Sequence, residues 1–175
     1  MRTNPKAKGR RVERGNKVVP RYHQEKLKTV KIVIKKKEGC ADLPVPKYAT
    51  SGSSGMDLSA DVDGEVQILP GEIKLISAGI YLSIPEGYEA QIRPRSGLAL
   101  KHGISLVNTP GTIDSDYRGL LSLIMINHGK EPFTIRRGDR VAQMVIEEVT
   151  RADIEVKTEL DDTVRAAGGF GHTGK

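Results

Sequence analysis

Residues 80–94 read Ile-Tyr-Leu-Ser-Ile-Pro-Glu-Gly-Tyr-Glu-Ala-Gln-Ile-Arg-Pro. Apolar side chains occupy every second position from residue 80 to 84 and again from residue 88 to 92. A period of two is typical of a β-strand with one buried face. The Pro-Glu-Gly at residues 85–87 interrupts the pattern with residues that favour a turn. The segment therefore predicts two strands joined by a short turn.

Similar short runs continue on both sides of this segment. Alternating apolar residues occur at Val30–Ile34, Val66–Ile68 and Phe133–Ile135, and a longer mixed run spans Val141–Val149. Residues Leu120–Ile126 are nearly all apolar, which predicts a strand buried on both faces. Many short strands divided by Pro and Gly turns predict an all-β domain, as a sandwich, jelly roll or barrel.

Helical pattern is nearly absent. Residues Ser96–His102 are long enough for one or two helical turns, with Ser96 as the N-cap and Gly103 just beyond the end. At the other extreme, residues 166–174 are glycine-rich and contain one aromatic residue, Phe170. Such a composition predicts a segment that is mobile when nothing is bound.

The charge of the chain is concentrated at one end. The 175 residues hold 28 Lys and Arg against 22 Asp and Glu, a net charge of +6. Residues 1–28 carry ten basic and two acidic side chains, which leaves 18 basic and 20 acidic ones for the rest. We expect residues 1–28 to be a basic, disordered extension, either a solvated tail or a weak contact for nucleic acid or another polyanion. Residues 29–160 are expected to form the β domain and residues 161–175 a C-terminal arm.

Composition excludes several classes of protein. No apolar run approaches the roughly 20 residues of a membrane-spanning helix, and no apolar stretch follows the first basic residues as in a secretory signal. We therefore expect a cytoplasmic protein that does not contact membranes. The single cysteine, Cys40, excludes an internal disulfide framework and is expected to be structural. Seven aromatic residues are too few to stack successive bases of a single strand.

Five short segments combine glycine with charged or hydroxyl side chains: Gly55–Ala60, Pro94–Ala99, Gly111–Gly119, Arg137–Met144 and Arg165–Gly174. Each alone is weak evidence, because the same residues make ordinary turns. Together, and in this order, they closely resemble the five motifs of the trimeric dUTPases. The most specific matches are Pro-Arg-Ser-Gly at 94–97, Ile-Asp-Ser-Asp-Tyr-Arg-Gly at 113–119 and Gly-Gly-Phe-Gly-His-Thr-Gly at 168–174. The resemblance covers roughly residues 29–174 and leaves the basic extension outside it.

The resemblance implies a fold, an assembly and a reaction. The fold is a jelly-roll-like subunit, or distorted β-barrel, with a flexible C-terminal arm. The assembly is a homotrimer with three active sites between subunits, in which the arm of one chain closes over the site of another. The reaction is hydrolysis of dUTP to dUMP and pyrophosphate with Mg²⁺ on the triphosphate. It supplies dUMP for dTMP synthesis and keeps uracil out of DNA.

Three aspartates are candidates for the chemistry. Attack of water on the α-phosphorus needs a carboxylate that orients and deprotonates the water, and Asp114 fits this role. Its alternative is a turn-capping aspartate beside glycine. Asp116 points the same way if the hairpin is extended there, and we expect it to be secondary or structural. Asp57 is expected either near Mg²⁺, through water, or as an anchor of its own turn.

Phosphate binding needs donors and positive charge. Arg95, Ser96 and Gly97 lie at the expected helix start, where backbone N–H groups favour anions. Ser96 is expected to bind a phosphate oxygen. Arg95 either contacts phosphate or pairs with a carboxylate such as Asp114 or Asp57, and the sequence does not separate these roles.

The other phosphate contacts come from the fourth and fifth segments. Gln143 is a neutral donor suited to a phosphate oxygen, and Arg140 fits an ion pair. Arg165 fits the γ-phosphate through its planar fork of N–H donors. Gly171 and Thr173 would add backbone and hydroxyl donors.

Base recognition is expected from the hairpin that spans residues 108–117. Backbone N–H groups can meet O2 and O4 of uracil, a carbonyl can meet N3–H, and a tight pocket rejects the methyl group of thymine. Asn108 offers a side-chain amide, and Thr112 and Ile113 lie in the same hairpin. Tyr117 would pack under the deoxyribose and exclude a 2′-hydroxyl, or else be a core tyrosine. Phe170 has no core to join and is expected to stack on the base.

Two other functions remain open at this stage. A dCTP deaminase-type relative shares the fold and part of the third segment, although the glycine-rich tail with its phenylalanine favours a dUTPase. A non-catalytic protein that binds nucleic acid or a regulator on the same scaffold is the second alternative. The joint presence of Asp114, Tyr117, Arg165 and Phe170 favours catalysis.

Overall fold

The computed structural model of the chain describes residues 28–169. The chain divides into two units, Met1–Val30 and Lys31–Lys175, and the strands belong to the second. The strands are β1 (Val33–Lys36), β2 (Gly55–Ser59), β3 (Glu65–Ile68), β4 (Ile73–Ser83), β5 (Tyr88–Pro94), β6 (Ile104–Leu106), β7 (Gly111–Ile113), β8 (Leu120–Asn127), β9 (Phe133–Arg136) and β10 (Arg140–Glu148). A single helix, α1 (Ser96–His102), lies among the described residues. The all-β prediction is confirmed.

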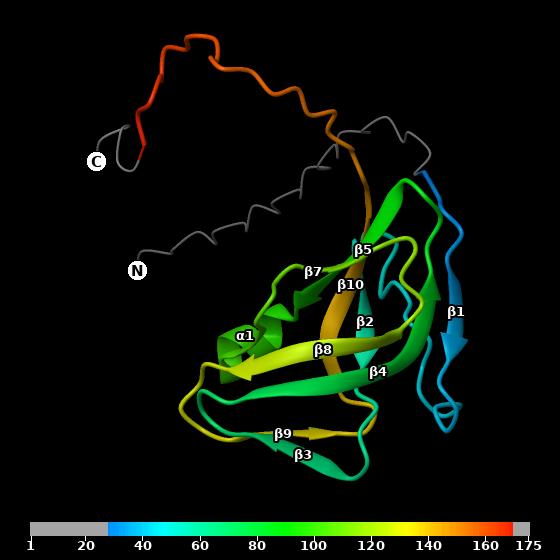
Figure 1. The fold of residues 1–175 in the computed structure, drawn as a ribbon. Coiled ribbons are helices and arrows are strands. Elements are labelled where there is room, and N and C mark those ends of the chain that lie inside the picture. The colour runs from blue at the N-terminus through cyan, green and yellow to red at the C-terminus, as the bar shows by residue number, and fades with distance from the viewer. Residues whose placement is uncertain (1–27, 170–175) are drawn as a thin grey trace, which may run out of the picture. The chain divides into compact units, whose positions relative to one another are not determined.

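Two four-stranded antiparallel sheets build the second unit (Figure 1). Sheet A has the order β1-β4-β8-β6, and sheet B has the order β2-β10-β5-β7. Strands β3 and β9 form a separate two-stranded sheet. The predicted turn at residues 85–87 joins β4 in sheet A to β5 in sheet B, so the two strands of the opening pattern belong to different layers.

The inner faces of the sheets share one hydrophobic cluster. Its buried members include Ile76 and Leu123 from sheet A and Leu58, Ile92 and Met144 from sheet B. Each large aliphatic side chain buried in this way contributes about 1.5–3 kcal/mol to stability. The shared core packs sheet B against sheet A, and the other face of sheet B carries mostly polar side chains such as Gln91, Arg93 and Gln143.

Strand β8 corrects one prediction. Leu121, Leu123 and Met125 are buried, but Ile124 on the opposite face is 37% exposed. The expectation that Leu120–Ile126 is buried on both faces is therefore wrong for the single chain. Sheet B covers only one face of sheet A, and apolar side chains of β4 and β8 remain exposed on the other.

The helix also differs from its prediction in one detail. Arg95, with extended backbone angles of −84° and 127°, is the N-cap, and Ser96 is the first helical residue. The predicted N-cap at Ser96 is wrong by one position, and no side chain caps the helix. The helix ends at His102 as predicted, and Gly103 follows it with a φ of 69°, in the left-handed region that favours glycine.

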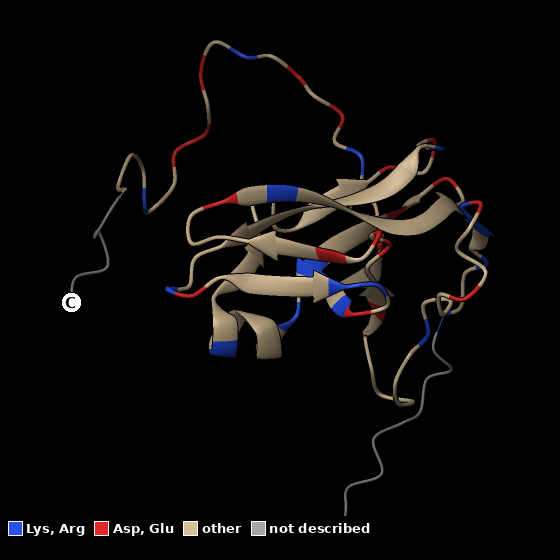
Figure 2. Cartoon of the chain, turned by 90° about the horizontal axis from the view of Figure 1, so that it is seen from below, with Lys and Arg blue, Asp and Glu red and all other residues tan. Residues whose placement is uncertain are grey.

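In Figure 2, many of the Lys, Arg, Asp and Glu positions lie in loops and near strand ends, and most of the strand ribbon is tan. Beyond β10, residues 149–169 form no helix or strand. No helix within residues 28–169 is long and apolar enough to cross a membrane.

Candidate active site

Three predicted residues meet at one end of sheet B. Arg95 Nε donates to Asp57 Oδ1 at 2.9 Å, and Arg140 Nη1 donates to Asp57 Oδ2 at 3.1 Å. Arg95 Nη1 also donates to the backbone carbonyl of Arg140 at 3.0 Å. Of the two roles left open for Arg95, the structure shows the pairing with a carboxylate, and that carboxylate is Asp57. We name Asp57, Arg95 and Arg140 the Asp57 cluster.

Gln143 lies beside this cluster on the outer face of sheet B. It stands opposite Asp57 on β2 and opposite Arg93 on β5. Its Nε2 donates to the carbonyl of Pro94 at 3.0 Å, which ties the end of β5 to β10. The Gln143 amide lies close over Gly55, so that a Cβ at position 55 would force the amide to move.

The start of α1 is open to solvent. Ser96 and Gly97 are exposed, and a Cβ built on Gly97 meets no heavy atom within 4 Å. The space beside these backbone groups is therefore free for an incoming group. Ser96 and Gly97 thus lie next to the Asp57 cluster, to which the preceding residue Arg95 belongs, at one end of sheet B.

The predicted hairpin contains β7, which pairs with β5. Thr112 is exposed opposite Gln91, and Ile113 packs partly buried opposite Ala90. The peptide bond between Thr109 and Pro110 is cis. Asn108 lies against Gly111, where a Cβ would come within 3.1 Å of the Asn108 Nδ2 atom.

Tyr117 is not a core residue. Its side chain is 44% exposed, and its hydroxyl donates to the Leu120 carbonyl at 3.2 Å. The ring lies over Gly119, where a Cβ would collide with it. The tyrosine is therefore held at the surface in one orientation, available to a ligand.

Asp114 lies at the opposite end of β5 from the Asp57 cluster. It follows Ile113, which pairs with Ala90, whereas Arg95 comes five positions after Ala90, about 16 Å further along an extended strand. The condition for Asp116 to point the same way is not met, because a turn closed by Tyr117 N donating to the Asp114 carbonyl at 3.2 Å replaces extended backbone. The single chain therefore does not bring Asp114 together with Asp57 or Arg95.

The Asp114 carboxylate is exposed and makes no hydrogen bond or ion pair with any residue in the described part of the chain. It lines a cleft of about 760 Å³. The cleft also receives Tyr88 and Glu89 from β5, Asp116 and Arg118 from the turn, and Arg151. An exposed carboxylate without a partner at the mouth of a cleft is free to accept a proton from water.

The C-terminal site residues are described only in part. Arg165 is exposed, and its Nε donates to the carbonyl of Gly168 at 2.9 Å. The predicted roles of Phe170, Gly171 and Thr173 fall outside the described residues. Residues 1–28, with their predicted polyanion contact, also lie outside them except for Lys28.

The donor set allows Mg²⁺ only in the expected, indirect manner. Among residues 28–169, no group of three or more His, Cys, Asp or Glu side chains is placed to hold a metal ion. Asp57 is the one predicted ligand, with its side chain 31% exposed and each oxygen already paired to a guanidinium. Mg²⁺ commonly keeps several waters and takes phosphate oxygens. Asp57 therefore fits only a contact through water with a metal ion whose other ligands come from a bound phosphate group.

Comparisons with known proteins show the family of the chain. The dUTPase family model matches residues 41–174, which is most of the chain. The chain belongs to the dUTPase family. The deoxyuridine 5'-triphosphate nucleotidohydrolase of Caldanaerobacter subterraneus subsp. tengcongensis is 58% identical over 146 residues, 83% of this chain and 99% of the relative. The enzyme of the same name from Syntrophotalea carbinolica is 55% identical over 148 residues, 85% of this chain and 99% of the relative.

Solved dUTPases share the fold at lower identity. The dUTPase of Staphylococcus bacteriophage 80alpha, solved with dUPNHPP, has a TM-score of 0.71 at 23% identity and covers 84% of this chain and 100% of its own. A mutant dUTPase from phage phi11 of S. aureus, described with a structural Mg(II) ion, has a TM-score of 0.67 at 20% identity. That match covers 76% of this chain and 100% of the phage chain. These likenesses place the present dUTPase in the same all-β fold.

Sequence reasoning missed a polar row on the outer face of sheet B. Arg93 Nη2 donates to Gln91 Oε1 at 2.6 Å and to Glu147 Oε1 at 3.1 Å, and Gln91 Nε2 donates to Glu89 Oε1 at 2.7 Å. The row runs along β5 from the Asp114 cleft towards the Asp57 cluster of this dUTPase. The alternation of residues 88–92 could have placed Glu89 and Gln91 outside, but their contacts depend on strand pairing.

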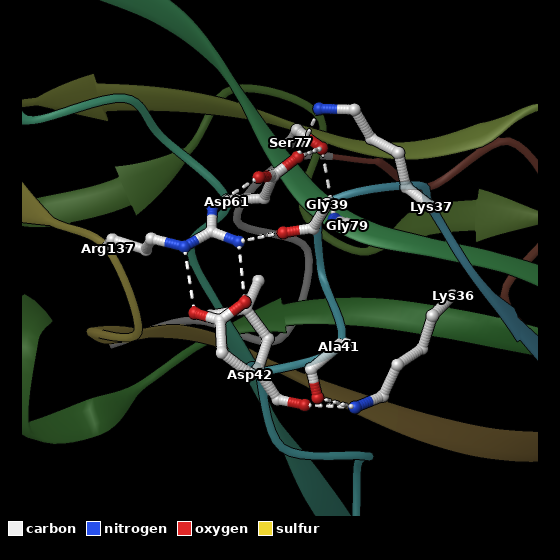
Figure 3. Close-up of polar contacts among 10 residues, drawn as sticks. Lys36, Lys37, Gly39, Ala41, Asp42, Asp61, Ser77, Gly79 and Arg137 are labelled. Atoms are coloured by element: carbon white, nitrogen blue, oxygen red, sulfur yellow. Dashed lines mark hydrogen bonds and ion pairs between the residues drawn. The ribbon is translucent and has the colours of Figure 1, made fainter.

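A second missed feature is a buried ionic group around Asp61, which we name the Asp61 cluster (Figure 3). The side chain of Asp61 is 5% exposed and accepts hydrogen bonds from Lys37 at 2.6 Å, Arg137 at 2.7 Å and Ser77 at 2.9 Å. Burial raises the pKa of Asp61, but hydrogen bonds from Lys37, Arg137, Cys40 and Ser77 outweigh burial and hold the pKa far below its usual range. Cys40 is buried in this group, as its structural prediction requires.

The depressed pKa of Asp61 makes stability depend on pH. We expect Asp61→Asn to destabilise the fold at pH 7 by about 1–3 kcal/mol, because it removes the buried anion that accepts hydrogen bonds from Lys37, Arg137 and Ser77. The ionised Asp61 stabilises the folded state fully above the unfolded carboxyl pKa of about 3.9, and this stabilisation is lost as the pH falls below that value. The free energy of unfolding, measured with urea, should therefore differ less between wild type and Asp61→Asn at pH 3 than at pH 7. Asp63→Asn is the matched control, because Asp63 is a nearby exposed aspartate. A loss of unfolding free energy in Asp61→Asn that is equal at pH 7 and pH 3 would contradict the expectation.

Proposed function

We propose that this dUTPase-family chain hydrolyses dUTP to dUMP and pyrophosphate, with Asp114 activating the water that attacks the α-phosphorus. The observation that carries the proposal is the Asp114 carboxylate, which is exposed, unpaired within the described chain and set at a cleft. A general base needs such freedom, since a carboxylate locked in ion pairs would bind a proton weakly. Membership of the family supports the type of reaction, and the exposed carboxylate of Asp114 supports its role as the general base.

The hairpin at residues 108–117 is the proposed uracil site. Asn108 packs against Gly111, and β7 is fixed to β5 through Thr112 and Ile113, so the backbone donors and acceptors of the hairpin are held on a rigid sheet. Tyr117 stands exposed beside it, held by its hydroxyl and by contact with Gly119. A ring in this position supports the proposed packing under deoxyribose and the exclusion of a 2′-hydroxyl.

The triphosphate is proposed to lie at the Asp57 end of sheet B. Ser96, Gly97 and Gln143 provide donors there, and Arg165 with Phe170, Gly171 and Thr173 would close over it from the arm. Mg²⁺ bound to the triphosphate would neutralise negative charge, and Asp57 would accept hydrogen bonds from its water. Arg95 and Arg140 hold the two oxygens of Asp57 and so fix the orientation of that carboxylate.

A homotrimer is proposed because one chain does not hold a complete site. Asp114 and the Asp57 cluster occupy opposite ends of β5, so a substrate held by both must lie between copies. Two apolar surfaces support association. On the outer face of sheet A, Ile73 and Leu75 are 53% and 68% exposed, beside Ile124 on β8. Ile154 and Val156 in the C-terminal segment are 82% and 92% exposed. Neighbouring exposed apolar side chains such as those on sheet A mark interaction surfaces when they form a large patch.

The cellular role follows from the reaction. Hydrolysis of dUTP supplies dUMP for dTMP synthesis and lowers the dUTP available for incorporation into DNA. We propose that the enzyme acts on the nucleotide pool of the cytoplasm.

The test is pyrophosphate release from dUTP, UTP, dTTP, dCTP and dATP with Mg²⁺. We expect dUTP to be preferred by kcat/KM over each of the others by about 10²-fold or more, because the hairpin and Tyr117 reject changes at the base and at the 2′ position. A chelator should lower the rate. Ammonia released from dCTP would favour the deaminase alternative, and no pyrophosphate from any nucleotide would reject the proposal in favour of a non-catalytic protein.

A further inference from the structure

The guanidinium of Arg137 joins three separate parts of the chain (Figure 3). Its Nε and Nη2 donate to the two oxygens of Asp42 at 2.9 and 2.8 Å, and its Nη2 also donates to the Gly39 carbonyl at 2.7 Å. Its Nη1 donates to Asp61 at 2.7 Å. A two-point grip on a carboxylate fixes a guanidinium in orientation as well as in place. Arg137 is therefore held rigidly from both the residue 39–42 loop and the end of β2.

The residues of the Asp61 cluster are closely packed against β4 and have little room to move. Gly79, with φ of 66°, has no space for a Cβ, which would come within 2.9 Å of Cys40 Sγ and 3.1 Å of the Asp61 Cβ. The carbonyl of Gly79 accepts a bond from Lys37 N at 2.9 Å, and its N–H donates to Ser77 Oγ at 3.0 Å. Backbone of β4 thus packs directly on the Asp61 cluster. The Asp61 cluster is therefore held in one position beside the turn at residues 136–139.

Arg137 lies in the turn that leads into β10. Asp139 N donates to the Arg136 carbonyl at 3.0 Å, and Asp139 Oδ2 accepts from Arg136 N at 2.8 Å. The turn is also bonded to the end of β2, through Ala60 N to the Asp139 carbonyl at 2.8 Å and Gly138 N to the Ala60 carbonyl at 2.9 Å. Arg137 therefore lies within a bonded turn, three residues before Arg140, the first residue of β10.

Immediately after this turn, a β-bulge in β10 changes the face of sheet B on which the Arg140 side chain lies. The pairing with β2 shifts register between Arg140 and Ala142, so that Val141 is an extra residue. Val141 and Ala142 are both buried, at 2% and 0% exposure, although neighbours in a regular strand point to opposite faces. A regular strand would direct Arg140 to the inner face with Ala142. The bulge instead places Arg140 on the outer face, where it reaches Asp57.

We propose that Arg137 and Asp61 are positioning residues for the active site. They hold the turn and the bulge in the register that carries Arg140 to Asp57, and so they act on the triphosphate end of the site from the other side of β2. This inference rests on the proposed function in one respect, which is that the Asp57 cluster lies where the triphosphate of dUTP binds. Neither Arg137 nor Asp61 contacts the Asp57 cluster directly through its side chain, so their effect on turnover passes through Arg140.

The experiment is a double-mutant cycle in kcat/KM for dUTP with Arg137→Ala, Arg140→Ala and both together. We expect Arg137→Ala to lower kcat/KM by about 10²-fold, since small displacements of positioned groups cost that much. In the Arg140→Ala background the same change should cost no more than about threefold, because the residue it positions is already gone. Losses that multiply would overturn the proposal. The rates are measured where circular dichroism shows every variant folded.

Two further variants separate positioning from general stability. Arg136→Ala removes a neighbouring arginine whose Nε pairs with Glu65 at 2.6 Å on the surface, and it should leave kcat/KM within about twofold. If Arg137→Ala does not fold, Arg137→Lys keeps a cation beside Asp61 but loses the grip on both oxygens of Asp42. We expect Arg137→Lys to lower kcat/KM and to weaken binding of dUpNHpp, the compound bound in the phage dUTPase structure. Arg136→Lys is its matched control, and equal values of kcat/KM and binding in the two variants would overturn the proposal. Wild-type chain that does not hydrolyse dUTP would instead reject the proposed function itself.

Discussion

Replacing Asp114 by asparagine should lower kcat for pyrophosphate release from dUTP by about 10²- to 10⁴-fold, the usual contribution of a general base. The substitution keeps the size of the side chain and removes only its basicity. Because the Asp114 carboxylate makes no hydrogen bond or ion pair within the described chain, its loss should not disturb the fold. Binding of dUpNHpp should be nearly unchanged, so that the loss falls on kcat rather than on KM.

Asp116→Asn is the matched control for this experiment. Asp116 lies in the same turn, lines the same cleft and is also exposed, so it shares the local electrostatics of Asp114. We expect a change of no more than about threefold, which is the scale of a screened surface charge. Turnover undiminished in Asp114→Asn would rule out Asp114 as the base. A larger loss in Asp116→Asn would transfer that role to it.

The sequence predicted β1, β3 and β9 as well as the longer strands, because their apolar side chains alternate or form a continuous apolar run. Strands β2, β6 and β7 were not predicted. Strands β6 and β7 have three residues each, too few to show an alternation, and β2 contains glycine and aspartate, which are uncommon in strands. The exposed face of β8 was missed for a different reason. An apolar run does not show whether its second face meets the same chain or another copy, and Ile124 is exposed in the single chain.

The candidate site was predictable as a set of residues but not as an arrangement. The motifs identify Asp57, Arg95 and Arg140, yet their pairing joins positions 38 and 83 residues apart and depends on the order of strands in sheet B. The bulge that turns Arg140 outward has no marker in the sequence Arg-Val-Ala-Gln. The roles of Asp61 and Arg137 likewise appear only when their separation of 76 residues is closed by the fold.

The separation of Asp114 from the Asp57 cluster leads to the second large effect. Asp114→Asn chains and Arg95→Ala chains should each be nearly inactive alone, yet unfolding and refolding them together at equal amounts should restore about a quarter of wild-type activity. In a mixed symmetric assembly, a site is intact only when one neighbour supplies a wild-type Asp114 and the other a wild-type Arg95. Each has a chance of about one half, and the product is about one quarter.

A second mixture makes the result independent of how well the chains refold. A chain that carries both substitutions is refolded with an equal amount of wild type. Sites built between chains again require two wild-type neighbours, so about a quarter of the activity should remain. Sites built within one chain would give no recovery in the first mixture and about one half in the second. The roughly 20 Å along β5 between the level of Asp114 and Arg95 leads us to expect equal activity in both mixtures.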